Sequence, residues 1–216
     1  MAKLNGTAVE LTLKPENGKL EHKAGQFLFV GFKGDRVLGE PHPFTISSAP
    51  GEESLRLAIR ASGDFTQHLY DNLAEGTQAV VDGSYGRFDH TTGGDKQIWI
   101  AGGIGVTPFL SWLRSMDGEA ACDVDFFYSV RVAEDALYLE ELQAVDKAFD
   151  WFRLHVSFSS RDGHLTAEKI TEISGSPIGK DIYLCGPVAM VESLRRQLVK
   201  LGVSQGNMHH EEFSFR

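Results

Sequence analysis

The sequence predicts a β domain followed by an α/β domain: an antiparallel barrel or sandwich over residues 1–92, then a doubly wound parallel sheet over residues 93–216. The first ninety or so residues contain short β segments separated by turn residues. Beyond them, near-continuous apolar runs alternate with segments of helical spacing, which is typical of parallel strands buried on both faces. A polar stretch, His90 to Lys96, separates the two patterns, and we place the domain boundary within it.

Alternation and turn residues predict five strands in the first domain. They are AVELTL (8–13), QFLFVGF (26–32), PFTISS (43–48), SLRLAIR (54–60) and TQAVVDG (77–83). One helix is expected from about Phe65 to Glu75, because Leu69 and Leu73 lie one helical turn apart and Gly76 is a stop signal. Only Met1 to Asn5 precede the first strand, which is too short for a full opening strand and lead-in.

The second domain has four apolar runs that predict buried strands. They are QIWIAG (97–102), DVDFFYSV (123–130), FRLHVSF (152–158) and DIYLCG (181–186). Segments with helical spacing lie between them. Because strands and helices alternate, the strands are expected to be parallel.

Composition excludes several classes of protein. With 42% apolar and 24% charged residues the chain is an ordinary folded domain, and a net charge of −9 argues against a nucleic-acid binder. Neither a secretory signal nor a membrane-spanning run is present, since the uncharged stretch 98–113 is interrupted by glycines and Pro108. Two cysteines predict neither a disulfide framework nor an iron–sulfur cluster, and we expect a reducing, cytoplasmic setting.

The segment Gly102 to Pro108 is the sharpest local signal, because its glycines follow a strand and open a helix. Such a junction lets backbone approach a pyrophosphate, and the helix N-terminus presents unpaired N–H groups. Thr107 is expected to cap the helix, with Pro108 at its first position. The alternative is a tight structural turn without a ligand.

A later strand ends in Cys185, Gly186 and Pro187, where open parallel sheets bind ligands. Cys185 would then face whatever the glycine loop holds; the alternative is a buried thiol. In the first domain, the strand at His42 to Ser48 combines rings and hydroxyls that suit a planar aromatic cofactor. Arg60 leads to a helix start at Gly63 to Thr66, a second phosphate seat, so two nucleotides are expected.

Five motifs in this order resemble the ferredoxin–NADP reductase superfamily, and within it the flavin domains of ferric reductases and NADPH oxidases. The motifs are Gly25-Gln26-Phe27, His42-Pro43-Phe44-Thr45, Gly83-Ser84-Tyr85-Gly86, the loop 102–108 with Cys185-Gly186-Pro187, and Glu211-Glu212-Phe213. The resemblance implies an FAD-binding domain at 1–92 and an NAD(P)-binding domain at 93–216.

The resemblance also implies residue roles. Phe44 would lie against the isoalloxazine and Thr45 would hydrogen-bond near flavin N5, while His42 stands where many relatives have arginine. The remaining expected FAD contacts are Pro43, Arg60, Gly63, Asp64, Phe65 and Thr66. The dinucleotide would be held by Gly103, Gly105, Val106 and Thr107, with Cys185, Gly186 and Pro187 beside the nicotinamide. Glu211 would be an active-site carboxylate, and Phe213 or Phe215 would stack on the flavin.

Coenzyme choice rests on two cations. Ser160 and Arg161 lie near where relatives that use NADPH hold the 2′-phosphate, and Arg131 follows a strand at which an acidic residue would favour NADH. These residues favour NADPH. In the competing alignment, Arg161 to Gly163 is a structural turn before a helix at Thr166.

The expected activity is hydride transfer from NADPH or NADH to FAD, then release of single electrons, with Thr45, Cys185 and Glu211 as the catalytic set and no metal site. The expected acceptor is the haem of a transmembrane domain, with this chain on the cytoplasmic face as part of a larger protein. One alternative is a free-standing flavin or ferredoxin reductase with a soluble acceptor. Another is a nucleotide-binding module without turnover.

Overall fold

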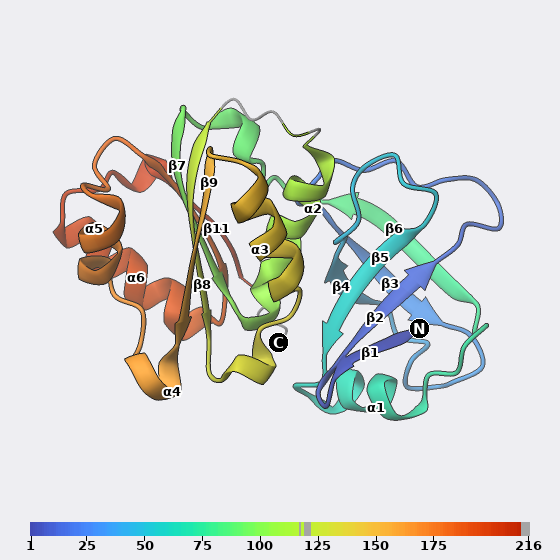
Figure 1. Ribbon diagram of the computed structural model, residues 1–216. Coiled ribbons are helices and arrows are strands. Elements are labelled where there is room, and N and C mark those ends of the chain that lie inside the picture. Colours follow the sequence, from blue (N-terminus) through green and yellow to red (C-terminus); the bar gives the residue numbers. More distant parts are fainter. Residues whose placement is uncertain (117, 119–121, 213–216) are drawn as a thin grey trace. The chain divides into compact units, whose positions relative to one another are not determined.

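The computed structural model describes residues 1–116, 118 and 122–212 (Figure 1). Contacts divide the chain into two compact units, residues 1–87 with 107–115, and residues 88–106 with 116–216. The first contains antiparallel sheets and the second a parallel sheet, which confirms the predicted fold class. Helix α2 (Thr107–Ser115) is grouped with the β unit, although it follows the glycine loop of the α/β unit in sequence.

The first unit has two three-stranded antiparallel sheets. One has the order β1 (Ala2–Asn5), β2 (Ala8–Leu13), β5 (Leu55–Arg60), and the other β4 (His42–Thr45), β3 (Phe27–Phe32), β6 (Ala79–Tyr85). A bridge between Ile46 and Leu57 connects them. Leu28 and Val30 are fully buried while Phe27 and Phe29 are half-buried, as the alternation predicts.

Three expectations for this unit need correction. Residues 2–5, expected to be too few for an opening strand, do form one, because β1 pairs antiparallel with β2. Helix α1 (Asp64–Asn72) ends before the predicted Glu75, since the backbone is already extended at Leu73. Strand β4 ends at Thr45 instead of Ser48, because the next residues leave the ladder with β3.

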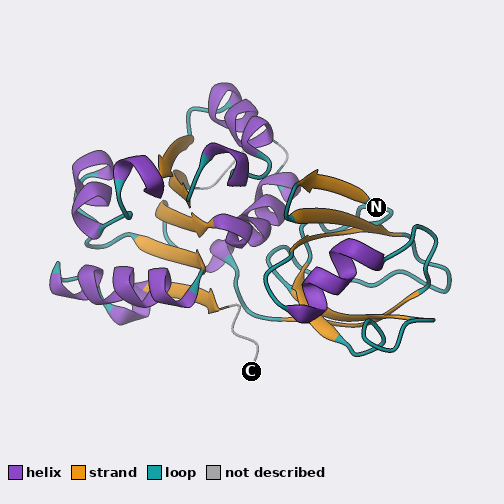
Figure 2. Cartoon of the chain, turned by 90° about the horizontal axis from the view of Figure 1, so that it is seen from below, coloured by secondary structure: helices purple, strands orange, loops and turns teal. Residues whose placement is uncertain are grey.

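The second unit is a parallel sheet with helices on both faces (Figures 1 and 2). Its strand order is β11 (Met208–Glu212), β10 (Asp181–Gly186), β7 (Lys96–Gly102), β8 (Asp123–Val130), β9 (Phe152–Phe158). Its helices are α3 (Leu139–Ala148) on one face, α5 (Ala167–Ser174) and α6 (Val188–Lys200) on the other, and the short α4 (Ser159–Asp162) after β9. Because β8 and β10 flank β7 on opposite sides, the switch point lies between β7 and β10.

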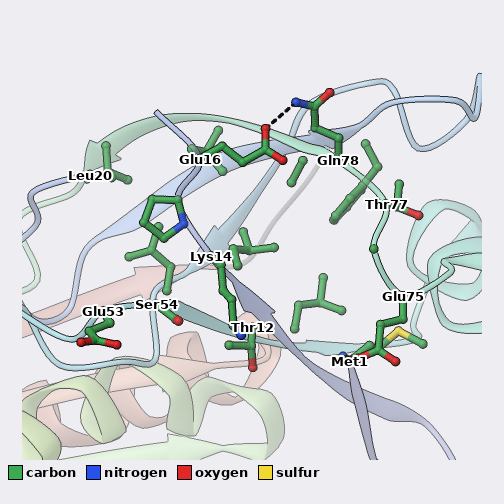
Figure 3. A pocket seen from close by; sticks show the side chains of 18 of the residues that line it. Met1, Thr12, Lys14, Glu16, Leu20, Glu53, Ser54, Glu75, Thr77 and Gln78 are labelled. Carbon is green, nitrogen blue, oxygen red and sulfur yellow. Dashed lines mark hydrogen bonds and ion pairs between the residues drawn. The ribbon is translucent and has the colours of Figure 1, made fainter. Parts of the chain in front are cut away.

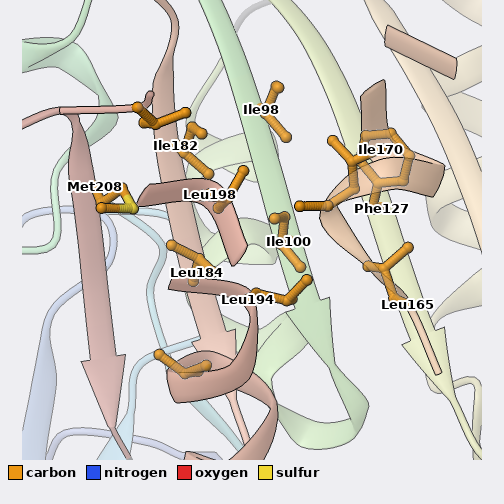
Figure 4. Close-up of a cluster of buried hydrophobic side chains, with 13 residues drawn as sticks. Ile98, Ile100, Phe127, Leu165, Ile170, Ile182, Leu184, Leu194, Leu198 and Met208 are labelled. Atoms are coloured by element: carbon orange, nitrogen blue, oxygen red, sulfur yellow. The ribbon is translucent and has the colours of Figure 1, made fainter. Parts of the chain in front are cut away.

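Apolar side chains on one face of the sheet form a single cluster with α5 and α6 (Figure 4). Ile98, Ile100 and Leu184 of the central strands contribute to it together with Leu194 and Leu198 of α6. Each such side chain contributes about 1.5–3 kcal/mol when it is fully buried. This core fixes the strand ends that carry the glycine loop and Cys185.

Candidate cofactor sites

The rings expected to contact a flavin lie on β4 and at the start of α1. The His42 ring stacks on Phe65, with centroids 3.7 Å apart and planes at 26°. Phe44 lies 6.3 Å from the same ring and also packs against the core of the first unit. The structure therefore places three of the predicted FAD contacts on one aromatic surface.

The Thr45 hydroxyl is the observation that best tests whether a cofactor fits here. Thr45 is 4% exposed, and its Oγ1 has no hydrogen-bond partner among the described residues. A buried polar group left unsatisfied costs about 1–3 kcal/mol. A heteroatom of a bound flavin would satisfy this hydroxyl, so the site fits the cofactor that the resemblance implies.

Helix α1 starts at Asp64, and its first turn is organised by Thr66. The Thr66 Oγ1 accepts hydrogen bonds from the backbone N–H groups of Ser62 (2.9 Å) and Gly63 (3.1 Å), and donates to the Gly63 carbonyl (3.1 Å). Its hydroxyl therefore caps its own helix, which leaves the N–H groups of the first turn for a phosphate. Arg60 lies at the end of β5, three residues before this turn.

The glycine loop forms a 3₁₀ turn, Gly103–Val106, between β7 and α2. A Cβ on Gly105 would lie 2.3 Å from the Cys185 carbonyl oxygen, so this glycine permits close packing of the loop on β10. Gly103 has a φ of 54°, which favours glycine, and its carbonyl accepts a hydrogen bond from the Tyr128 hydroxyl at 3.3 Å.

Burial separates the loop residues that a dinucleotide could touch from those that hold the loop. Gly105, Val106 and Thr107 are buried, whereas Gly103 and Ile104 are half-buried. Thr107 is the first residue of α2 and follows the 3₁₀ turn directly, so the expected cap preceding the helix is not observed. Sequence reasoning missed Ile104 and Tyr128, because no motif marks either residue.

Cys185 and Glu211 are neighbours across the β10–β11 ladder, at the carboxyl ends of both strands. Cys185 is fully buried, and burial together with the nearby Glu211 raises the pKa of its thiol well above the usual value. Burial also raises the pKa of Glu211 to about 7, and its Oε2 is buried without a partner among the described residues. The pair therefore combines a protonated thiol with a carboxyl group that can hold a proton near neutral pH.

Arg161 is engaged by its own neighbour. Its Nε and Nη2 donate to the two carboxylate oxygens of Asp162 at 2.7 and 3.0 Å. Asp162 also accepts from the Phe158 N–H, and Gly163 with a φ of 70° ends α4. Thr166 then caps α5, which is the turn of the competing alignment. The Ser160 N–H donates to the Arg131 carbonyl at 3.1 Å, so these two residues are adjacent.

Other expectations concern features outside these sites. Phe213 and Phe215 lie outside the described residues. No group of three or more potential metal ligands and no helix able to cross a membrane is found in the described part of the chain. His209 instead donates to or accepts from Asp181 at 2.9 Å and stacks on Tyr183.

A cavity of about 550 Å³ opens at one end of the first unit (Figure 3). Leu11, Leu13 and Phe32 line it, and Gln78 donates to Glu16 at its rim. None of the sequence-predicted site residues is among its lining residues. We therefore base the cofactor sites on the motifs and their geometry instead of on this cavity.

Taken together, a β unit with an unsatisfied threonine and an α/β unit with a glycine loop define a class of protein that binds a flavin and a pyridine nucleotide. Family models agree: residues 1–105 match an FAD-binding domain, and residues 99–196 match an oxidoreductase NAD-binding domain. The chain belongs to the ferredoxin–NADP reductase superfamily of NAD(P)H-dependent flavoprotein oxidoreductases.

Curated relatives are similar over most of this chain. A glycine betaine monooxygenase reductase subunit of Pseudomonas aeruginosa is 30% identical over 88% of the chain and 56% of its own length. The reductase component of propane 2-monooxygenase from Rhodococcus jostii is 28% identical over 95% of the chain and 60% of its own length. The chain thus spans a little more than half the length of these relatives.

Solved structures share the fold. A ferredoxin NADP⁺ reductase from Neisseria gonorrhoeae with bound FAD and NADP superimposes with a TM-score of 0.80 at 20% identity, covering 95% of this chain and 92% of that one. An Amycolatopsis cytochrome P450 reductase gives a TM-score of 0.81 at 23% identity, covering 98% and 67%. At these identities the likeness establishes the fold alone.

Proposed function

We propose that this chain transfers electrons from NADPH or NADH through FAD to a one-electron acceptor. The buried, unsatisfied Thr45 hydroxyl carries this proposal, because it requires a hydrogen-bonding group that the polypeptide does not supply. When bound, the two cofactors supply hydride donation and hydride acceptance, which is chemistry that no side chain here needs to perform.

The chain's own residues bind, orient and hold protons. Thr45 would hydrogen-bond near flavin N5, and the first turn of α1 would hold the pyrophosphate, which favours FAD over FMN. Gly103 and the half-buried Ile104 would contact the dinucleotide. Glu211, with its pKa of about 7, would keep a proton in the buried strand-end site, where a full negative charge would oppose the arrival of hydride.

The acceptor is proposed by class. Two relatives are, by name, reductase components of monooxygenases, and another, from Bacillus cereus, is a flavohemoprotein that is 25% identical over 93% of this chain. These names support a haem or iron–sulfur centre in a partner domain or partner protein. The haem of a membrane ferric-reductase-like domain, with this chain at the cytoplasmic face, is one such partner, and a free-standing flavin or ferredoxin reductase is another arrangement.

The test compares Thr45→Val with Thr12→Val, a matched change at an exposed residue of β2. FAD binding is followed by absorbance and flavin reduction by rapid mixing with NADPH or NADH. We expect Thr45→Val to retain FAD and to slow reduction roughly 10- to 100-fold, and Thr12→Val to behave as the wild type. Failure of the wild type to bind FAD would contradict the proposal.

A second assay separates turnover from binding. Steady-state NAD(P)H oxidation with an artificial one-electron acceptor is expected in the FAD-loaded wild type. FAD and nucleotide binding without any oxidation would instead support the alternative of a nucleotide-binding module without turnover. Comparing haem and iron–sulfur acceptors in the same assay then distinguishes the possible partners.

A further inference from the structure

The residues immediately after Thr45 are buried and lie outside the regular β4 strand. Ile46, Ser47 and Ser48 are all fully buried. We call residues 46–49 the post-flavin segment, because they follow the strand that carries Thr45. Buried backbone groups must find hydrogen-bond partners, so each polar group of this segment has to be accounted for.

One side of the post-flavin segment is bound to β5. The Ser47 N–H donates to the Arg56 carbonyl at 2.8 Å, and the Arg56 N–H donates to the Ser48 Oγ at 3.1 Å. Glu52 accepts from the Ala49 N–H at 2.7 Å and from the Arg56 guanidinium at 2.7 Å. These bonds leave the carbonyl oxygens of Ser47 and Ser48 for other partners.

Helix α2 supplies those partners. The Ser111 Oγ donates to the Ser48 carbonyl at 2.7 Å, and the Arg114 Nη1 donates to the Ser47 carbonyl at 2.7 Å. The two residues lie three positions apart and therefore share one face of the helix. Ser111 is fully buried, and a hydrogen bond from a charged guanidinium is stronger than a neutral one.

These bonds link two parts of the proposed site through short stretches of chain. Ser47 is two residues from Thr45, at most about 7 Å along an extended backbone. At the other end, α2 begins at Thr107, the residue directly after Val106 of the glycine loop. A change in the helix can therefore move the Thr45 hydroxyl without touching a cofactor.

We infer that Ser111 and Arg114 are positioning residues that set the Thr45 hydroxyl for the flavin from the helix that opens at the nucleotide loop. The inference rests on the proposed function for its kinetic readout. Its structural core, that the post-flavin segment is held by α2, can be measured in the protein without any cofactor.

The first experiment measures backbone hydrogen exchange with Arg114→Gln, Arg114→Lys and Ser115→Ala. Ser115 is the matched control, because its Oγ donates to the Trp112 carbonyl within α2 and does not reach the post-flavin segment. We expect Arg114→Gln to speed exchange at residues 45–49 roughly tenfold, about the loss of one hydrogen bond, and Arg114→Lys to restore it. Faster exchange confined to α2 would overturn the inference.

The second experiment is a double-mutant cycle between Arg114→Gln and Thr45→Val. Flavin reduction rate, the absorbance spectrum of bound FAD and its midpoint potential are measured in all four proteins. If Arg114 acts through Thr45, Arg114→Gln slows reduction roughly tenfold in the wild type and has little further effect in Thr45→Val. Additive effects in both backgrounds would show that Arg114 contributes only to stability and would overturn the inference.

A third arm keeps the two proposals separate. If the wild type binds FAD but is not reduced by NADPH or NADH, the proposed function fails. The flavin spectrum and the exchange data then still decide whether Arg114 positions Thr45. Should Ser111→Ala fail to fold, the half-buried Arg114 and its lysine variant carry the test alone.

Discussion

At the scale of single residues, Cys185 and Glu211 show how burial changes chemistry. Both lie at the carboxyl ends of neighbouring parallel strands, and burial raises the pKa of each. A solvent-exposed glutamate would be ionised at pH 7, whereas Glu211 is close to half protonated there. The same burial gives Glu211 a measurable effect on folding stability.

Glu211→Gln is expected to remove a pH dependence of stability. The pKa of Glu211 is raised from 4.5 in the unfolded chain to about 7 in the folded one, so the folded state binds the proton more tightly. Stability of the wild type therefore falls as pH rises from about 4.5 to about 7, by at most about 3 kcal/mol from this group.

Chemical denaturation across that pH range is the measurement. The difference between wild type and Glu211→Gln should grow with pH and level off above pH 7, with the variant more stable there. Glu172→Gln, at an exposed position of α5, is the control and should give no such difference. A constant difference between wild type and Glu211→Gln would contradict the assigned burial.

Cys185→Ala is expected to slow hydride transfer while FAD content stays unchanged, because Cys185 lies in the α/β unit beside the proposed nicotinamide position. Cys122→Ala is the matched control, since Cys122 is also a buried free thiol but lies at the amino end of β8. Rapid-mixing flavin reduction is the measurement. Equal rates in the two variants would identify Cys185 as a buried thiol with a packing role only.

At the scale of elements, three backbone segments meet at the switch point of the sheet. The 3₁₀ turn after β7 approaches the end of β10 so closely that only glycine fits at position 105. Gly102 and Gly186 also approach each other, and a Cβ on Gly186 would lie 2.9 Å from the Gly102 Cα. The loop geometry thus depends on backbone contacts that no side chain can replace.

Gly105→Ala is expected to destabilise the protein by about 1–3 kcal/mol or more, because the new Cβ would overlap backbone atoms that cannot rotate away. Gly94→Ala is the control in the same unit, since its Cβ would meet only the Asp181 carboxylate oxygen, at 3.6 Å. Thermal unfolding compares the two. A wild-type unfolding midpoint for Gly105→Ala would contradict the packing described here.

At the scale of the whole molecule, a net charge of −9 repels an anionic coenzyme at long range. Selection of NADPH over NADH must therefore come from local cations. Of the two candidates, Arg161 already forms two hydrogen bonds with Asp162, while Arg131 is exposed at the end of β8. Their contributions should consequently differ.

Arg131→Ala is expected to lower kcat/KM for NADPH roughly 10- to 100-fold and to leave NADH almost unchanged, the size expected for a lost charged hydrogen bond. Arg161→Ala should have a smaller effect, because Asp162 offsets its charge. Steady-state kinetics with both coenzymes provide the comparison. A wild-type preference for NADH would refute the assignment of a 2′-phosphate site.

Sequence patterns predicted the strands of both units because alternation and continuous apolar runs report which faces are buried, a local property. They missed strand β1, whose segment AKLN has little apolar content and is held by pairing with β2. Likewise, the glycine loop was recognisable from its spacing, whereas Ile104 and Tyr128 acquire a place in it only through the fold.

The sequence by itself determined the fold class, the order of the two units and the residues that mark the flavin strand and the nucleotide loop. Only the tertiary structure decided what each of these residues contacts: that Asp162 pairs with Arg161, that Thr45 is left without a partner, and that α2 holds the carbonyls after Thr45. The physical reason is distance along the chain. Ser111 and Ser48 are 63 residues apart, and no local pattern records a hydrogen bond between them.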